Sequence, residues 1–403
     1  MPSADVLIIG AGPAGINAAY ALEQAGIEYR IIERTRQLAP TWNSLYPSLR
    51  LNTSRFFSEL PGKRFPLHWG IHPTATQYYR YLVDWVGEQQ LSIEYGIEVY
   101  RVAPTSDGLW QTETSAGTDR YRAVIPATGV FDNPQLPQIE GMDRFEGDLL
   151  HSRDFRHPDQ IRDRRTLVVG NGPSGTDIAV AAGQIAAGGF AWLSIRSGVD
   201  LRPRYPYGLP RHAWMMLGET LPERACEWLQ RKTGAVKYNM GDFGVWQAPP
   251  NTGAGTGYRG PELLNALRQG QVLPVRHPVS FDARGVTLAD GGYIEVDVVI
   301  MATGFLPVLH QYLDIDMQSS NEMFYPEVGC DWDIGPNGIR GWPLRDVSEH
   351  PNGRGVLGHE GLYLVGVFYK GRGAFYNMRA EARIAAEQIQ AQLARRRVAA
   401  VAA

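Results

Sequence analysis

Cysteine is scarce in this chain: its 403 residues include two, Cys226 and Cys330. The two lie far apart and no Cys-X-X-Cys motif occurs, so the sequence encodes neither a paired-thiol redox centre nor a cysteine zinc site. We expect two free thiols in a reducing compartment.

Long apolar runs and long runs of like charge are missing as well. No uncharged apolar segment reaches the roughly 20 residues that a membrane helix requires. The first expected strand starts near Asp5, which leaves no room for a signal peptide. The 39 basic and 42 acidic side chains give a formal net charge of −3, which excludes a broad basic surface for nucleic acid. The sequence predicts a cytoplasmic protein without nucleic-acid or membrane partners, and it is compatible with a homodimer.

A metal site is not expected either. His68 and His72 have the i, i+4 spacing of two ligands on a helix. Gly70 between them and Pro73 after them disfavour a helix there, and no third ligand is evident. We expect both histidines to lie in a loop.

The chain does contain two glycine-rich loops, each directly after an apolar run. Residues 6–9 form the first run, which is typical of a parallel strand buried on both faces. In such a unit the first glycine permits a tight turn, the second lets a pyrophosphate approach the backbone, and the third lets the helix pack on the strand. The helix N-terminus then faces the phosphates. The candidate cofactor-binding residues of this loop are Gly10, Gly12, Pro13, Ala14 and Gly15.

The next expected strand, residues 29–32, ends on Glu33. A carboxylate at this place accepts hydrogen bonds from ribose hydroxyls and repels a 2′-phosphate, so the site suits FAD or NAD. We count Arg34 and Trp42 as further candidate cofactor contacts.

The second loop follows residues 166–169 and repeats the pattern. Its candidate residues are Gly170, Gly172, Pro173, Ser174 and Gly175. The next expected strand, 190–195, leads into Arg196 and Ser197 instead of an acid. An arginine there pairs with a 2′-phosphate and stacks on adenine, which favours NADPH over NADH. Arg202 and Arg204 are weaker candidates for the same role.

Two further expected strands end in Ala-Thr-Gly, which brings backbone close to a dinucleotide. The candidates there are Thr128, Gly129, Ala302, Thr303 and Gly304. The first of these strands, 121–126, also reads as the last strand of a β-meander with 97–102 and 109–114.

The domain order follows from these units and from the chain ends. Residues 201–260 are rich in Pro, Gly, Tyr and Trp and read as an insertion with one helical piece at 222–231. A last buried strand at 362–366 and a helix at 376–395 complete the first domain. We expect an α/β protein with two Rossmann-like dinucleotide-binding domains, the second inserted into the first. Its parts are 1–150, 151–290 with the insertion, and 291–403.

The residues resemble a known family, the class B flavoprotein monooxygenases, and within it the flavin-containing monooxygenases, including the plant YUCCA type. Between the two glycine loops, Phe145, Gly147, His151 and Phe155 match the family fingerprint FxGxxxHxxx(F/Y). The resemblance implies that the first domain binds FAD and the second NADPH. His151 lies in the linker between the two expected nucleotide folds, and we expect a histidine there to position those folds by hydrogen bonding to backbone or cofactor rather than to act as a general base.

The segment 51–54, Leu-Asn-Thr-Ser, resembles a further family motif. By its spacing alone, Asn52 is expected to cap a helix or form a turn. The resemblance instead implies that Asn52 is catalytic, lying beside the flavin and helping to hold NADP and reduced oxygen.

The implied activity is oxygenation of a nitrogen or sulfur atom of a small molecule, with NADPH, O2 and a C4a-hydroperoxyflavin. Baeyer–Villiger relatives usually carry tryptophan where Phe155 stands, often followed by proline, whereas Arg156 follows here. Baeyer–Villiger oxidation of a carbonyl substrate is thus disfavoured, but it remains the alternative that lies within the same family. An NADPH:acceptor flavin reductase and a non-catalytic NADPH-binding sensor are the others.

Overall fold

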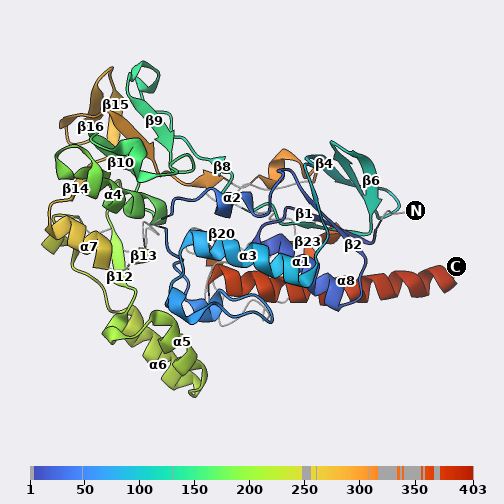
Figure 1. Ribbon diagram of the computed structural model, residues 1–403. Helices are drawn as coiled ribbons and strands as arrows, with labels where there is room; N and C mark the ends of the chain where they lie inside the picture. Colours follow the sequence, from blue (N-terminus) through green and yellow to red (C-terminus); the bar gives the residue numbers. More distant parts are fainter. Residues whose placement is uncertain are drawn as a thin grey trace. The chain divides into compact units, whose positions relative to one another are not determined.

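The computed structural model describes residues 4–47, 49–129, 131–246, 256–259, 261–306, 308–315, 334–335, 338–339, 355–356, 359–366 and 373–402. The chain divides into two compact units (Figure 1). The first contains Met1–Ser44, Thr53–Asn133 and Leu306–Ala403. The second contains Leu45–Asn52 and Pro134–Phe305. The first unit is thus built from both ends of the chain.

A six-stranded sheet forms the centre of the first unit, in the order β22-β23-β7-β1-β2-β3. β1 lies parallel to β2 and β7, and only β22 pairs antiparallel. The strands are β1 (Val6–Ile9), β2 (Tyr29–Glu33), β3 (Ile93–Tyr95), β7 (Ala123–Pro126), β22 (Gly355–Val356) and β23 (His359–Tyr363). All four side chains of β1 and of β7 are buried, as expected for central strands covered on both faces.

The helices of the first unit come from distant parts of the sequence. Helix α1 (Pro13–Gln24) lies side by side with the C-terminal α8 (Ala374–Ala402) (Figure 1). Helix α3 (Ala75–Gln89) begins after Thr74, whose hydroxyl accepts from the Gln77 backbone N–H while the Gln77 side chain accepts from the Thr74 N–H. This capping box satisfies backbone N–H groups at the start of the helix. The other short helices are α2 (Pro40–Asn43), η1 (Arg55–Phe57), η2 (Leu67–Trp69) and η8 (Leu309–Gln311).

An antiparallel meander packs on the first sheet. It consists of β4 (Val99–Pro104), β5 (Trp110–Thr114) and β6 (Gly117–Tyr121). Trp110 and Tyr121 join Leu7 and Val124 in one buried cluster. The expectation that 121–126 is the third meander strand was wrong: β6 takes that place, and β7 belongs to the parallel sheet. The mostly polar β6 pairs at the surface, whereas the aliphatic β7 suits the sheet centre.

A five-stranded, fully parallel sheet forms the centre of the second unit, in the order β14-β11-β10-β18-β9. Its strands are β9 (Asp148–His151), β10 (Thr166–Val169), β11 (Ala191–Ser194), β14 (Val272–Val275) and β18 (Val298–Met301). Helices α4 (Pro173–Ile185) and α7 (Pro261–Arg268) pack on one face. On the other lie β15 (Pro278–Phe281), β16 (Gly285–Leu288) and β17 (Tyr293–Glu295).

The expected domain limits of 150/151 and 290/291 were therefore wrong. β9 begins before residue 151 and β18 after residue 290, yet both belong to the second sheet, where β18 lies between β10 and β9. The aliphatic sequence of β18 identifies a buried strand but not the sheet that it joins. Pairing across the fold decided this.

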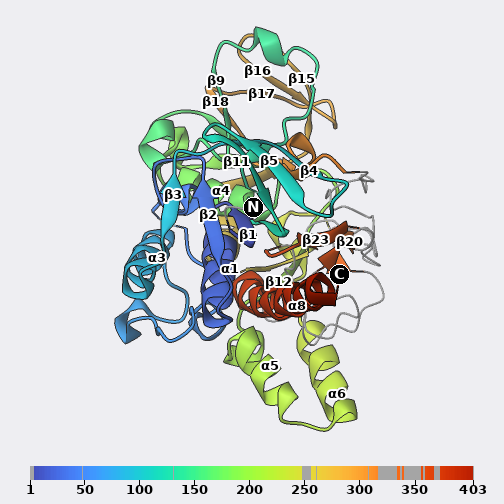
Figure 2. The ribbon, with the colours of Figure 1, turned by 90° about the vertical axis from the view of Figure 1, so that its right-hand side faces the viewer.

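The aromatic-rich insertion contains two helices rather than one. α5 (Arg211–Glu219) and α6 (Glu223–Gly234) form a hairpin (Figure 2). Pro210 and Pro222 stand immediately before the two helices, and the first of these start signals was overlooked. The remaining elements are β8 (Asn133–Pro134), η3 (Met142–Arg144), η4 (Pro158–Ile161), η5 (Ala187–Gly189), β12 (Asp200–Pro203), η6 (Pro206–Gly208), η7 (Met240–Phe243), β13 (Thr256–Arg259), β19 (Phe305–Leu306), β20 (Ile334–Gly335) and β21 (Gly338–Ile339).

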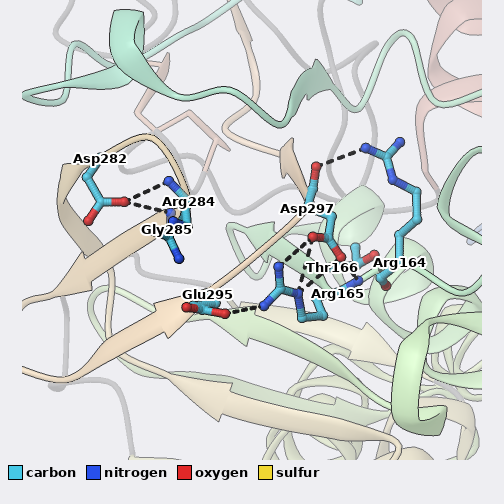
Figure 3. A network of polar contacts seen from close by, with 8 residues as sticks. All are labelled: Arg164, Arg165, Thr166, Asp282, Arg284, Gly285, Glu295 and Asp297. Atoms are coloured by element: carbon cyan, nitrogen blue, oxygen red, sulfur yellow. Dashed lines mark hydrogen bonds and ion pairs between the residues drawn. The ribbon is translucent and has the colours of Figure 1, made fainter.

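A polar network fixes the start of the second sheet (Figure 3). The Asp297 carboxylate accepts from the Arg165 backbone N–H at 2.8 Å and from its guanidinium Nη2 at 2.7 Å. The Arg165 carbonyl in turn accepts from the Asp297 N–H at 2.8 Å. These bonds set the register of β18 on β10 at the end of β10 away from the glycine loop. Among the described residues, no helix is both long and apolar enough to cross a membrane.

Candidate functional site

In the glycine loop after β1, one of the three glycines has room for a side chain and the other two do not. Gly10 has φ +103°, and a Cβ there would lie 2.8 Å from the Ala127 carbonyl oxygen. A Cβ on Gly15 would lie 1.9 Å from the Gly10 oxygen, whereas one on Gly12 would meet nothing within 4 Å. The chain itself therefore requires Gly10 and Gly15, while Gly12 borders free space at the start of α1.

The start of α1 is suited to an anion. Gly12 is its N-cap and no side chain caps it, while Pro13 occupies the first turn and has no N–H. Pro13 and Ala14 are buried. The free N–H groups of the first turn and the helix dipole are the features that bind phosphates. The observed cradle fits a pyrophosphate.

Glu33, the last residue of β2, is held beside this loop. Its Oε2 accepts from the Ala11 N–H at 3.0 Å and its Oε1 from the Thr35 N–H at 2.9 Å. Each carboxylate oxygen has a second lone pair, so these bonds orient the group and leave acceptor capacity for a ribose. Arg34 forms an ion pair with Asp132.

The other candidates of the first unit lie near the end of β7 and in α2. The Thr128 hydroxyl is 3.3 Å from that of Tyr312, and burial raises the pKa of Tyr312. Gly129 has φ +71° and a Cβ there would meet nothing within 4 Å. Trp42 stacks edge-on against Tyr78 with ring centroids 4.7 Å apart. The contact of Tyr312 with Thr128 was missed because nothing in the local sequence of Tyr312 links it to Thr128.

The loop after β10 repeats the geometry of the first. Gly170 has φ +110° and a Cβ there would lie 2.4 Å from the Ala302 oxygen, while one on Gly175 would lie 1.8 Å from the Gly170 oxygen. A Cβ on Gly172 would meet nothing within 4 Å. Pro173 and Ser174 open α4, again without a side-chain cap. The second cradle also fits a pyrophosphate.

The strand beside this second loop carries the opposite charge. β11 lies next to β10 as β2 lies next to β1, and it leads into Arg196, which is exposed, and Ser197, which is half-buried. An exposed guanidinium is free to meet a 2′-phosphate.

The candidates at 302–304 belong to the second unit, not to the returning first domain. Ala302 lies against Gly170 and Gly175. The Thr303 hydroxyl donates to the Gln135 carbonyl, and Gly304 has φ +90°. These residues follow β18, whose place in the second sheet was not expected.

His151 ends β9 and both of its ring nitrogens are engaged. Nδ1 accepts from the Arg153 N–H at 3.1 Å, so Nε2 carries the proton and donates to the Gly304 carbonyl at 3.1 Å. His151 as a residue is 4% exposed, its ring packs edge-on against Phe305, and burial lowers its pKa. The neutral imidazole thus ties the end of β9 to the turn after β18.

The other fingerprint residues also have packing roles. A Cβ on Gly147 would lie 2.5 Å from the Asp297 oxygen. Phe145 stacks edge-on against Phe281 and Phe155 against Tyr46. The fingerprint residues therefore pack β9 and the segment after it into the second unit.

Asn52 lies in the second unit, in the short segment Leu45–Asn52, and its side chain is exposed. Its Oδ1 accepts from the Arg204 Nη2 at 3.3 Å. The sequence separation of 152 residues explains why this contact was not foreseen.

Metal chemistry finds no support among the described residues. They contain no group of three or more His, Cys, Asp or Glu side chains that could hold an ion. His68 lies in the three-residue 3-10 helix η2 rather than in a loop, and η2 ends at Trp69, so His68 and His72 do not share a helix.

The chain is similar to known proteins both in sequence and in fold. A family model described as pyridine nucleotide-disulphide oxidoreductase matches residues 7–188. An indole-3-pyruvate monooxygenase of the YUCCA group from Oryza sativa subsp. indica is 28% identical, over 87% of each chain. A solved flavin-containing monooxygenase from Stenotrophomonas maltophilia has a TM-score of 0.68 at 22% identity, covering 98% of this chain and all of that one.

The same fold also occurs in a reductase. A bacillithiol disulfide reductase from Staphylococcus aureus has a TM-score of 0.66 at 16% identity, covering 97% of this chain and 99% of that one. At such identity the likeness concerns the fold alone. In sequence the chain is similar to monooxygenases over most of its length, and in fold it is similar both to flavin-containing monooxygenases and to this reductase.

Proposed function

We propose that the first unit binds FAD and the second NADPH, as two Rossmann-like domains of which the second is inserted into the first. One observation carries this proposal. Both units have a glycine loop whose middle glycine faces open space, but Glu33 stands beside the first and Arg196 beside the second. A carboxylate suits the ribose hydroxyls of FAD, and a guanidinium suits the 2′-phosphate of NADPH.

In this arrangement the protein binds and orients, and the cofactors supply the redox chemistry. FAD, when bound, would supply the redox chemistry: NADPH would provide the two electrons, one atom of O2 would go to the substrate and the other would leave as water. The Gly12 and Gly172 loops hold the two pyrophosphates on helix N-termini. Thr128, Gly129, Arg34 and Trp42 complete the FAD side, and Ser197, Thr303 and Gly304 the NADPH side. His151 holds β9 and β18 together without exchanging a proton, because its nitrogens are already engaged.

We further propose that the substrate offers a soft nucleophilic nitrogen or sulfur. Phe155 is followed by Arg156 rather than by proline, which disfavours the Baeyer–Villiger type. Carbonyl oxidation is the second candidate, because curated relatives are named for indole-3-pyruvate, which carries a carbonyl. We propose Asn52 as the catalytic residue, as its resemblance to the family motif implies.

The first prediction tests both the reaction and the substrate class. Purified protein is given NADPH, ¹⁸O2 and, in turn, an amine, a sulfide, a ketone and a 2-oxo acid. We expect one labelled oxygen atom in an N-oxide or S-oxide per NADPH consumed, measured by mass spectrometry, and slower turnover with NADH.

Two outcomes would contradict this proposal. Labelled ester or acid from the carbonyl compounds alone would establish the Baeyer–Villiger alternative. NADPH oxidation that needs a disulfide or dye acceptor and leaves O2 unconsumed would establish the reductase.

A further inference from the structure

The contact between Arg204 and Asn52 joins two parts of the second unit that are far apart in sequence. Arg204 follows β12 directly, and its Nη2 donates to the Asn52 side-chain oxygen at 3.3 Å. Its Nε is buried and has no hydrogen-bond partner among the described residues. Among the described residues, the bond to Asn52 is therefore the one hydrogen bond that the Arg204 side chain makes.

The chemistry of the pair fixes which way the amide faces. An asparagine side chain has one acceptor oxygen and two N–H donors, whereas a guanidinium only donates. Arg204 can consequently bind Asn52 through Oδ1 alone. With Oδ1 held, the two N–H donors of Nδ2 point away from Arg204, and the flip that exchanges oxygen and nitrogen would place donor against donor.

The backbone beneath Arg204 is well anchored. Leu201 of β12 is fully buried in the core, and its carbonyl accepts from the Tyr238 N–H at 3.1 Å. The Arg204 carbonyl accepts from the Arg211 N–H at 3.1 Å, at the start of α5. An exposed side chain such as Asn52 gains orientation from a partner that is held in this way.

We propose that Arg204 is a positioning residue, which holds the side-chain oxygen of Asn52 and thereby fixes the direction in which the amide N–H donors point. This proposal rests on the proposed catalytic role of Asn52. It gives Arg204 a different task from the 2′-phosphate contact considered from the sequence, and leaves that contact to Arg196. Arg204 touches no reacting atom in this arrangement and acts through Asn52.

The test is a double-mutant cycle with Arg204→Met, Asn52→Ala and the double variant, and with Arg204→Lys as the conservative form. We expect Arg204→Met to release about tenfold more H2O2 per NADPH consumed, since a hydrogen bond to a charged group contributes about that factor. Arg204→Lys should restore part of the coupling. In the Asn52→Ala background, Arg204→Met should change nothing further.

Two readouts do not depend on turnover with substrate. The unfolding temperature should fall by about 2 °C in Arg204→Met but not when Asn52→Ala is already present. The ratio of NADP⁺ to NAD⁺ dissociation constants, from fluorescence titration, should stay unchanged in Arg204→Met and should collapse in Arg196→Ala.

The proposal is overturned if the two substitutions add fully, or if Arg204→Met shifts the NADP⁺ to NAD⁺ ratio as Arg196→Ala does. In the second case Arg204 is a phosphate ligand. Failure of the proposed function would look different, because the unsubstituted protein itself would yield no oxygenated product. The unfolding cycle would still decide whether the two side chains are coupled.

Discussion

At the scale of the residue, the fingerprint residues around His151 make packing contacts and hydrogen bonds within the second unit. His151 spends both ring nitrogens on the backbone of the second unit, one on Arg153 and one on Gly304. Gly147 leaves room for the Asp297 carbonyl, where a Cβ would clash. A side chain with both hydrogen-bonding atoms engaged and a lowered pKa is poorly suited to act as a general base.

His151→Ala should therefore reduce cofactor retention more than proton transfer. The change leaves a cavity and deprives the Gly304 carbonyl of its donor, which costs about 2–3 kcal/mol of unfolding free energy. We expect a lower FAD absorbance per protein or a weaker NADP⁺ affinity, with the pH–rate profile unmoved. His157→Ala, at an exposed histidine, is the matched control. Full cofactor content combined with a displaced pH–rate profile would contradict this role.

The same residue predicts how stability depends on pH. Burial holds the pKa of His151 below its usual 6.5 in the folded protein. As the pH falls below 6.5, the unfolded chain binds a proton at this histidine more readily than the folded protein does. The free energy of unfolding therefore has its full value with respect to His151 above pH 6.5 and declines below it. Denaturant midpoints between pH 5 and 8 should show this slope reduced in His151→Ala.

At the scale of the element, the order of the second sheet depends on side chains at the start of its strands. The hydrophobic pattern does not distinguish the positions of β10 and β18 in the sheet, because each strand is buried on both faces. The Arg165–Asp297 pair adds the specific register, with Thr166 opposite Val298 (Figure 3).

Asp297→Asn should lower stability modestly. The carboxylate is 36% exposed, so solvent screening limits the loss to about 0.5–1 kcal/mol. Arg165 lowers the pKa of Asp297, so this stabilisation is present above the unfolded value of 3.8 and is lost as the pH falls through the lowered pKa. Urea midpoints at pH 7 and pH 3 measure both effects. Glu295→Gln, at a carboxylate that is 50% exposed, should cost less, and an equal loss would contradict the assignment.

At the scale of the whole molecule, one device occurs twice. Each unit has a parallel strand, a glycine loop with an open middle position and a helix without a side-chain cap. The two copies differ in the residue at the neighbouring strand end, Glu33 or Arg196. The chain passes from the first unit to the second and back twice, and each copy lies entirely within one unit.

This division predicts separable losses. Gly12→Ala has room for its methyl group, so the protein should fold but bind FAD about tenfold more weakly, because the pyrophosphate can no longer approach the backbone. Gly172→Ala should keep its FAD and lose NADPH affinity by a similar factor. Equilibrium dialysis and NADPH titration measure the two constants. Gly15→Ala, whose methyl would overlap the Gly10 oxygen, should fail to fold, and loss of both cofactors in Gly172→Ala would contradict the division.

The sequence alone determined the local units and the residues of the two loops. Strands 6–9 and 166–169 were predicted with the observed bounds, because apolar runs followed by glycines mark buried strands. Glu33 and Arg196 were identified in the same way, since their distance from the glycines is a local property of one strand–helix–strand unit.

Only the tertiary structure decided which strands share a sheet and which side chains meet across it. β18 was given to the wrong domain, and the contacts of Tyr312 with Thr128 and of Arg204 with Asn52 went unseen. The physical reason is common to all three. Hydrophobic pattern reports whether a segment is buried, but the identity of its neighbours is set by pairing and packing between segments that are distant in the chain.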